Sequence, residues 1–138
     1  MTPEEHILSE LNDQQQVAVT QTEGPVMVLA GAGSGKTRVL TYRIAYMLAV
    51  NNISPYRILA LTFTNKAAAE MRERIVQLVG GQLAKAVTMG TFHSVFYRIL
   101  RAEAEKIGFN NNITIYDTDD AKSLIKNIVK EMGLDPKQ

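Results

Sequence analysis

The stretch Val26-Met27-Val28-Leu29-Ala30-Gly31-Ala32-Gly33-Ser34-Gly35-Lys36-Thr37 joins an apolar run to a glycine-rich turn and a lysine. A continuous apolar run of this length is typical of a strand that is buried on both faces of a sheet. Beyond the turn, apolar residues recur at helical spacing, at Leu40, Ile44, Met47 and Leu48. The stretch therefore predicts a strand over 26–30, a tight loop and an amphipathic helix, which together form a building unit of parallel α/β sheets.

The loop over 30–37 has the composition of a phosphate-binding loop. Its glycines permit a backbone that brings N–H groups close to an anion at the positive end of a helix. Lys36 adds a positive charge for the terminal phosphates, and the Thr37 hydroxyl suits Mg²⁺, so these two are the candidate catalytic residues and Thr37 the candidate metal ligand. We expect ATP or GTP to be bound by Gly31, Ala32, Gly33, Ser34, Gly35, Lys36, Thr37 and Arg38.

Two further strand–helix units follow the loop, with strands predicted over 58–62 and 86–89 and helices over 66–79 and 92–107. Asn65 is expected to cap the first of these two helices. A helix near 13–20 precedes the loop, with Asn12 as its cap and Gln15 three residues on. Three successive strand–helix units predict an α/β fold with a parallel sheet and flanking helices.

Beyond Gly108 the pattern loosens into an asparagine-rich loop and a helix predicted over 118–132. Ile113–Asp117 has the form of an apolar strand that ends in a metal-binding carboxylate. The helical pattern after Asp117 favours the role of helix cap instead.

Composition describes an ordinary globular chain. Its 138 residues are 46% apolar and 21% charged and include no cysteine, which excludes disulfides and thiolate metal sites. No apolar run approaches the roughly 20 residues that span a membrane, and the acidic start of the sequence does not resemble a signal peptide. We expect a cytoplasmic protein with no membrane contact.

Charge is unevenly distributed along the chain. Residues 31–101 contain ten Lys and Arg against two acidic residues, whereas residues 1–30 contain five acidic residues and no Lys or Arg. The middle of the chain is therefore where a polyanion would be attracted, although ordinary solvated helix faces explain the same charges.

Four motifs occur in one order and at set intervals: residues 11–15, 30–37, 62–68 and 90–94. Together they resemble the N-terminal part of superfamily 1 DNA helicases of the UvrD/Rep/PcrA kind. The resemblance implies a partial P-loop (RecA-like) sheet with flanking helices over 1–108, which forms part of the first ATPase motor domain. It also implies that 109–138 begin an inserted helical subdomain.

The resemblance also implies roles for individual residues. Gln15 would read the edge of adenine, which favours ATP, unless it serves only the helix cap. Two groups would contact single-stranded DNA: Phe63, Thr64 and Asn65, and Thr91, Phe92 and His93. A core position for Phe63 and a packing role for His93 are the alternatives. Tyr42, Tyr46 and Tyr97 are expected to pack in the interior rather than to stack bases.

The function implied for the full-length protein is that of an ATP-dependent DNA helicase or translocase in DNA repair or replication, acting on single strands and single-strand/duplex junctions. The acidic motif, the arginine finger and the second motor domain of such enzymes are missing from these 138 residues. We therefore expect a fragment that binds ATP but is inactive alone. Its unpaired sheet edges predict either self-association or a displaced, partly rearranged sheet near 26–30.

Two other classes of nucleotide-binding protein are the alternatives. A small P-loop nucleotide kinase or nucleotide-binding switch should carry an arginine-rich lid and an acidic base beyond the third strand, and the sequence has neither. A module that holds nucleotide without turning it over is compatible with this chain.

Overall fold

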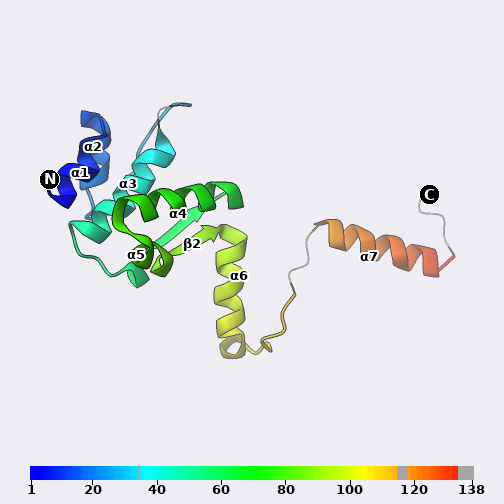
Figure 1. The fold of residues 1–138 in the computed structure, drawn as a ribbon. Coiled ribbons are helices and arrows are strands. Elements are labelled where there is room, and N and C mark those ends of the chain that lie inside the picture. The colour runs from blue at the N-terminus through cyan, green and yellow to red at the C-terminus, as the bar shows by residue number, and fades with distance from the viewer. Residues whose placement is uncertain (34, 115–117, 134–138) are drawn as a thin grey trace. The chain divides into compact units, whose positions relative to one another are not determined.

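The computed structural model describes residues 1–33, 35–114 and 118–133, and the chain divides into two units, Met1–Val95 and Phe96–Gln138 (Figure 1). The boundary predicted at 108/109 concerns the inserted subdomain and stays a prediction.

The first unit contains most of the regular structure. Its elements in order are α1 (Pro3–Leu8), α2 (Asp13–Thr20), α3 (Lys36–Ala49), the 3-10 turn η1 (Pro55–Arg57), β1 (Leu59–Thr62), α4 (Asn65–Val79), α5 (Gly81–Ala86), β2 (Thr88–Thr91) and the start of α6 (Phe92–Glu103). The helices predicted near 13–20 and over 66–79, and the helix after the loop, are confirmed. The short helices α1 and α5 were not predicted, since six residues carry too little periodicity.

Within the described ranges the sheet is parallel, as predicted, and has two strands. β1 pairs with β2 in a register that runs from Leu59 opposite Thr88 to Thr62 opposite Thr91. β2 starts two residues later than predicted because Ala86 ends α5. Since the two strands are parallel and end at the same level, the residues that follow them emerge at one edge of the sheet.

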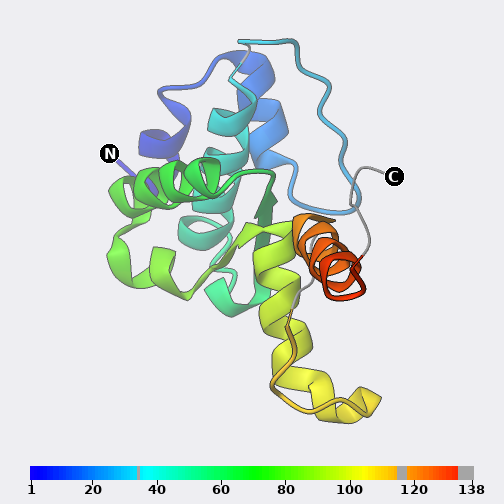
Figure 2. The same ribbon diagram turned by 90° about the vertical axis from the view of Figure 1, so that its right-hand side faces the viewer.

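The prediction of a strand over 26–30 is wrong. These residues form no strand in the structure, and the side chains of Met27 and Leu29 are 84% and 88% exposed. Figure 2 shows the segment between α2 and α3 as a long open loop. An apolar run becomes a buried strand only where its backbone finds partners, and the sheet of the described residues pairs β1 with β2 alone. Of the two outcomes expected for unpaired edges, the displaced segment is observed, and nothing supports self-association.

The observed architecture is therefore a mixed one, with a small parallel sheet and flanking helices. The assignment of this architecture to a partial P-loop (RecA-like) sheet stays a proposal.

Helix α3 holds the first unit together because both of its sides are buried. One side packs on α4 and the strands, in a cluster formed by Ile44, Leu48, Ile58, Ala60, Met71, Ile75, Ala84, Val87 and Met89. The other side packs on α1 and α2, in a cluster formed by Ile7, Leu11, Val19, Val39, Tyr42, Ala45 and Tyr46. Burial of apolar surface on two sides fixes the N-terminus of α3 relative to α1, α2 and α4.

The cap of α4 differs from the prediction. Asn65 is the first residue of the helix, and Thr64 is its N-cap, whose side-chain oxygen accepts a hydrogen bond from Ala67 N at 3.1 Å. Threonine and asparagine are both common caps, so the sequence alone did not separate adjacent candidates. The predicted cap of α2 is confirmed, since Asn12 Oδ1 accepts from Gln15 N at 2.9 Å.

The second unit contains the rest of α6, the 3-10 turn η2 (Ala104–Ile107) and α7 (Thr118–Glu131), so the predicted helix over 92–107 ends in a tighter turn. The Tyr97 hydroxyl donates to Ile113 O at 3.0 Å, in keeping with a packing role. Asp117, the predicted cap of α7, lies outside the described residues. No helix among the described residues is long and apolar enough to cross a membrane.

Candidate functional site

The glycine-rich loop leads directly into α3. Gly33 and Gly35 have φ angles of +75° and +83°, and Gly35 is the N-cap of the helix. Glycine reaches this left-handed region without the strain that a side chain would cause. Because the first N–H groups of a helix lack partners within it, the start of α3 presents donors toward the loop. Ser34 lies outside the described residues.

The two candidate catalytic side chains stand at the first two positions of α3, and both are exposed. Lys36 Nζ folds back over the loop and donates to Ala30 O and Gly31 O, at 3.3 Å each. A methyl group added to Gly31 or Gly33 would meet nothing within 4 Å, so there is open space beside the loop. A triphosphate needs N–H donors, a lysine and room, and the start of α3, Lys36 and the open space beside the loop are the candidates to supply them.

The Thr37 side chain is exposed at the second position of α3, and it would have to hold Mg²⁺ together with phosphate oxygens. Within the described ranges no group of three or more His, Cys, Asp or Glu side chains is placed to bind a metal. Magnesium commonly uses one or two protein oxygens together with phosphates and waters, so the Thr37 hydroxyl fits a share of that coordination.

Gln15 lies against the loop as well as in the cap of α2. Its Oε1 accepts from Asn12 N at 3.2 Å, which completes a capping box. Its Nε2 would be 3.1 Å from a Cβ placed on Gly35. An amide oxygen can accept two hydrogen bonds, so the capping role leaves the amide able to accept from adenine N6 and donate to N7. The two predicted roles of Gln15 are thus compatible.

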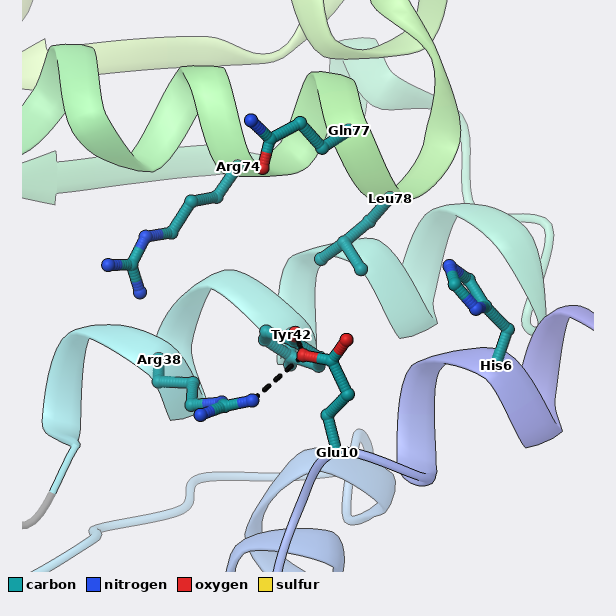
Figure 3. Close-up of a pocket in the computed structure, with 7 residues that line it drawn as sticks. All are labelled: His6, Glu10, Arg38, Tyr42, Arg74, Gln77 and Leu78. Carbon is teal, nitrogen blue, oxygen red and sulfur yellow. Dashed lines mark hydrogen bonds and ion pairs between the residues drawn. The ribbon is translucent and has the colours of Figure 1, made fainter.

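Arg38 borders a surface pocket of about 450 Å³ between α1, α3 and α4, lined by His6, Glu10, Arg38, Tyr42, Arg74, Gln77 and Leu78 (Figure 3). Arg38 Nη2 lies 2.8 Å from Glu10 Oε2, and the Tyr42 hydroxyl donates to the same carboxylate. The Arg38 guanidinium carbon lies 5.4 Å from the centre of the Tyr42 ring. Three side chains from two parts of the chain therefore hold one another beside the start of α3.

The contacts in this pocket shift the pKa values of Glu10 and Tyr42 in opposite directions. Hydrogen bonding from Tyr42 and the nearby Arg38 charge lower the pKa of Glu10 below its usual value, against the effect of burial. Burial raises the pKa of Tyr42, and the hydrogen bond to Glu10 adds to the rise. The Tyr42 hydroxyl therefore stays protonated as a donor, and Glu10 stays ionised as an acceptor, at neutral pH. The hydrogen bond to Glu4, at 2.8 Å, likewise raises the pKa of Tyr46.

The predicted DNA-contacting residues meet at the carboxyl edge of the sheet. Phe63 follows β1 and Phe92 follows β2, and their ring centres are 5.8 Å apart with a tilt of 43°. Phe63 is 92% exposed and Phe92 43% exposed, so the alternative of a core position for Phe63 is wrong. An exposed aromatic pair offers flat faces on which bases stack without being identified.

The polar members of this edge differ in how they are used. Thr64 caps α4, and Asn65 is exposed at the first position of that helix. Thr91 Oγ1 accepts from Ser94 N at 3.2 Å and lies 3.0 Å from Ser94 Oγ, which orders the start of α6. His93 is exposed, so the alternative of a packing role for it is wrong. Exposed polar side chains at this edge suit contacts to phosphates.

Two residues with structural influence on the site were missed by the sequence reasoning. Half-buried Arg72 donates from Nη1 to Ala84 O at 3.1 Å and from Nη2 to Met89 O at 3.3 Å, which ties β2 to α4. Glu10 is the second, and no periodicity or motif distinguishes it. The contacts of both residues depend on which distant segment of the chain packs beside them. A single sequence gives no signal for that packing.

Comparisons with known proteins agree with the resemblance to UvrD/Rep/PcrA helicases that the four motifs indicated. The family model for the UvrD/REP helicase N-terminal domain matches residues 11–138. The ATP-dependent DNA helicase PcrA of Staphylococcus aureus (strain Mu50) is 54% identical over 132 residues, and PcrA of Staphylococcus epidermidis (strain ATCC 12228) is 52% identical over 132 residues. In both cases the match covers 96% of this chain and 18% of the relative, so the chain spans less than a fifth of their length.

Proposed function

Because this chain belongs to the UvrD/REP helicase N-terminal domain family, we propose that it is the ATP-binding N-terminal portion of an ATP-dependent DNA helicase that translocates on single-stranded DNA. In the full-length protein this portion would couple ATP hydrolysis to duplex unwinding at single-strand junctions, in DNA repair or replication. The rival assignment of a small nucleotide kinase or switch is not favoured by the relatives.

The observation that carries the proposal is the position of the Gln15 amide against Gly35, at the point where the loop becomes α3. Phosphate donors and a base-reading amide then lie within the reach of one nucleotide. Gly31, Ala32, Gly33, Ser34 and Gly35 would cradle the phosphates through backbone N–H groups. Lys36 would neutralise the terminal phosphates, Thr37 would hold Mg²⁺, and Arg38 would lie beside the nucleoside.

The DNA-binding part of the proposal is supported by the exposed pair of Phe63 and Phe92. Their strands end at one level and their rings are 5.8 Å apart, so a single strand of DNA that contacts one ring would also contact the other. Thr64, Asn65, Thr91 and His93 surround this pair and would contact the backbone. Hydrolysis of ATP bound at the glycine-rich loop would supply the free energy for translocation, and the residues of this chain would bind and position the nucleotide.

Nucleotide binding is tested by calorimetry on the 138-residue chain with Mg²⁺ and ATP. Lys36→Ala should weaken binding by about 1.5–3 kcal/mol, because it removes a bond to a charged group. Lys85→Ala, which removes an exposed lysine on α5, is the matched control and should leave the affinity unchanged. Equal affinities for wild type and Lys36→Ala would remove the loop from the proposal. A phosphate-release assay on the same samples should show little turnover by this chain.

DNA binding is tested by fluorescence anisotropy with a labelled single-stranded oligonucleotide at low salt. Phe63→Ala should weaken binding by about 1–3 kcal/mol, the contribution of one stacked base. Tyr56→Ala is the matched control, because Tyr56 is an exposed aromatic residue that precedes β1 rather than following it. Equal effects of the two substitutions would count against a DNA path over the carboxyl edge of the sheet.

A further inference from the structure

We propose that Glu10 is a positioning residue for the nucleotide site, which orients the Arg38 guanidinium beside the nucleoside end of bound ATP. The inference rests on the proposed function, since it gives Arg38 a ligand to contact. Glu10 acts through Arg38 and touches no phosphate-binding residue of the loop in the described structure.

The carboxylate of Glu10 is shared between two donors from α3. Arg38 and Tyr42 stand four residues apart, so their side chains lie on one face of the helix. Glu10 Oε2 accepts from Arg38 Nη2 at 2.8 Å and also from the Tyr42 hydroxyl, while the guanidinium lies over the Tyr42 ring. Figure 3 shows the three side chains converging on one point. The guanidinium is therefore held by an ion pair and by an aromatic face together.

The two residues that hold the Arg38 guanidinium, Tyr42 and Glu10, are themselves held in place by the packed core. Tyr42 is only 6% exposed and belongs to the cluster that packs α3 on α1 and α2. Glu10 stands between buried Ile7 and buried Leu11, so the backbone that carries it is held on both sides. An ion pair this exposed contributes little to stability, and we therefore assign its effect to the orientation of Arg38.

The Cβ of Arg38 and the side-chain amide of Gln15, which is proposed to read adenine, both lie next to Gly35. A Cβ on Gly35 would be 3.7 Å from Arg38 Cβ and 3.1 Å from Gln15 Nε2. Arg38 Nε is buried and makes no hydrogen bond within the described structure, so that donor is not used to hold the side chain. A guanidinium oriented in advance loses less conformational freedom when a ligand arrives, which improves affinity without a new contact.

The test compares binding of Mg²⁺–ATP and of inorganic tripolyphosphate to the 138-residue chain by calorimetry. Glu10→Ala should weaken ATP binding about three- to tenfold, the usual effect of leaving one long side chain unordered. Tripolyphosphate has no nucleoside, so its affinity should not change. Glu10→Gln keeps the shape and an acceptor for Tyr42 and should lose less than Glu10→Ala.

A double-mutant cycle shows whether Glu10 acts through Arg38. In an Arg38→Ala background, Glu10→Ala should cause no further loss of ATP affinity. Glu4→Ala is the matched control, because it removes a similar carboxylate–tyrosine bond between α1 and Tyr46 and leaves Arg38 untouched. A purely structural role for Glu10 predicts that the Glu4 and Glu10 variants behave alike, with melting temperatures by circular dichroism as the reference.

The outcomes separate this inference from the proposed function. If Lys36→Ala weakens ATP binding but Glu10→Ala and Glu10→Gln leave it unchanged or tighten it, the inference is overturned and the proposed function stands. Equal weakening of tripolyphosphate, or additive losses in the Arg38→Ala background, overturns it as well. If wild type binds no ATP, or Lys36→Ala binds as wild type does, the proposed function fails and the positioning role fails with it.

Discussion

Gln15 serves two parts of the molecule, because its oxygen closes the start of α2 while its nitrogen lies against Gly35. Lys36 also has two roles to separate. Its amine donates hydrogen bonds to two carbonyls of its own loop at 3.3 Å, and its side chain is exposed, so a ligand can reach it. Such dual use means that a simple alanine substitution mixes a structural effect with a binding effect. Substitutions that keep one role and remove the other are therefore the informative ones.

Gln15→Glu separates these two roles. Glutamate keeps the acceptor of the capping box but cannot donate to adenine N7, so the chain should keep its melting temperature and lose its preference for ATP over GTP. Gln15→Ala should lose the same preference and also about 0.3–1.5 kcal/mol of stability. The measurements are competition binding with ATP and GTP and thermal unfolding by circular dichroism. A wild-type chain that binds both nucleotides equally would contradict the base-reading role.

Among the elements, α4 connects the core to the candidate DNA edge. Its buried face, which includes Met71 and Ile75, packs on the strands and on α3. Its first turn begins directly after Phe63, where Thr64 supplies the cap. The start of this helix therefore determines where the exposed ring of Phe63 stands.

Thr64→Ala should cost about 0.5–2 kcal/mol of the free energy of unfolding, because Ala67 N loses its side-chain acceptor. Thr64→Ser restores an oxygen at the same place and should recover most of that loss. Asn65→Ala, one residue along, should change stability little, since Asn65 is exposed within the helix. Urea unfolding curves of the three variants provide the comparison. A larger loss of unfolding free energy for Asn65→Ala than for Thr64→Ala would mean that Asn65, and not Thr64, caps the helix.

On the scale of the whole molecule, the most unusual feature of the first unit is the open segment before the loop. Val26, Met27, Val28 and Leu29 are all exposed, although their composition is that of a core strand. The glycine loop is thus joined to a firmly packed helix on one side and to an unpaired segment on the other. The loop N–H groups that we propose to bind phosphate therefore depend chiefly on α3 for their position.

Hydrogen exchange measured by NMR or mass spectrometry should reveal this asymmetry. Amides of residues 27–30 should exchange about a hundredfold or more faster than those of α4 and β1, because only the latter lie in packed, hydrogen-bonded structure. The two groups are compared within one sample, so each serves as reference for the other. Equal protection in 27–30 would mean that the segment is paired in solution.

Local chemistry was sufficient for much of the fold. Asn12 with Gln15 identified the start of α2, and the alternation of apolar runs with helical periods identified β1, α4 and β2 as a parallel unit. Four ordered motifs identified the helicase family, and the loop over 30–37 identified the candidate phosphate site. These features could be predicted because each single helix, strand and motif among them is formed by residues close together along the chain.

The tertiary structure decided everything that depends on distant partners. Residues 26–30 have the pattern of a strand, but a strand exists only where another backbone pairs with it, and no pattern within five residues contains that condition. The bond of Glu10 with Arg38 and Tyr42 joins residues 28 and 32 positions apart, because α1 and α3 bury their apolar sides against each other. The closeness of Phe63 to Phe92 likewise follows from the register of β1 and β2, which only the packed sheet and α4 determine.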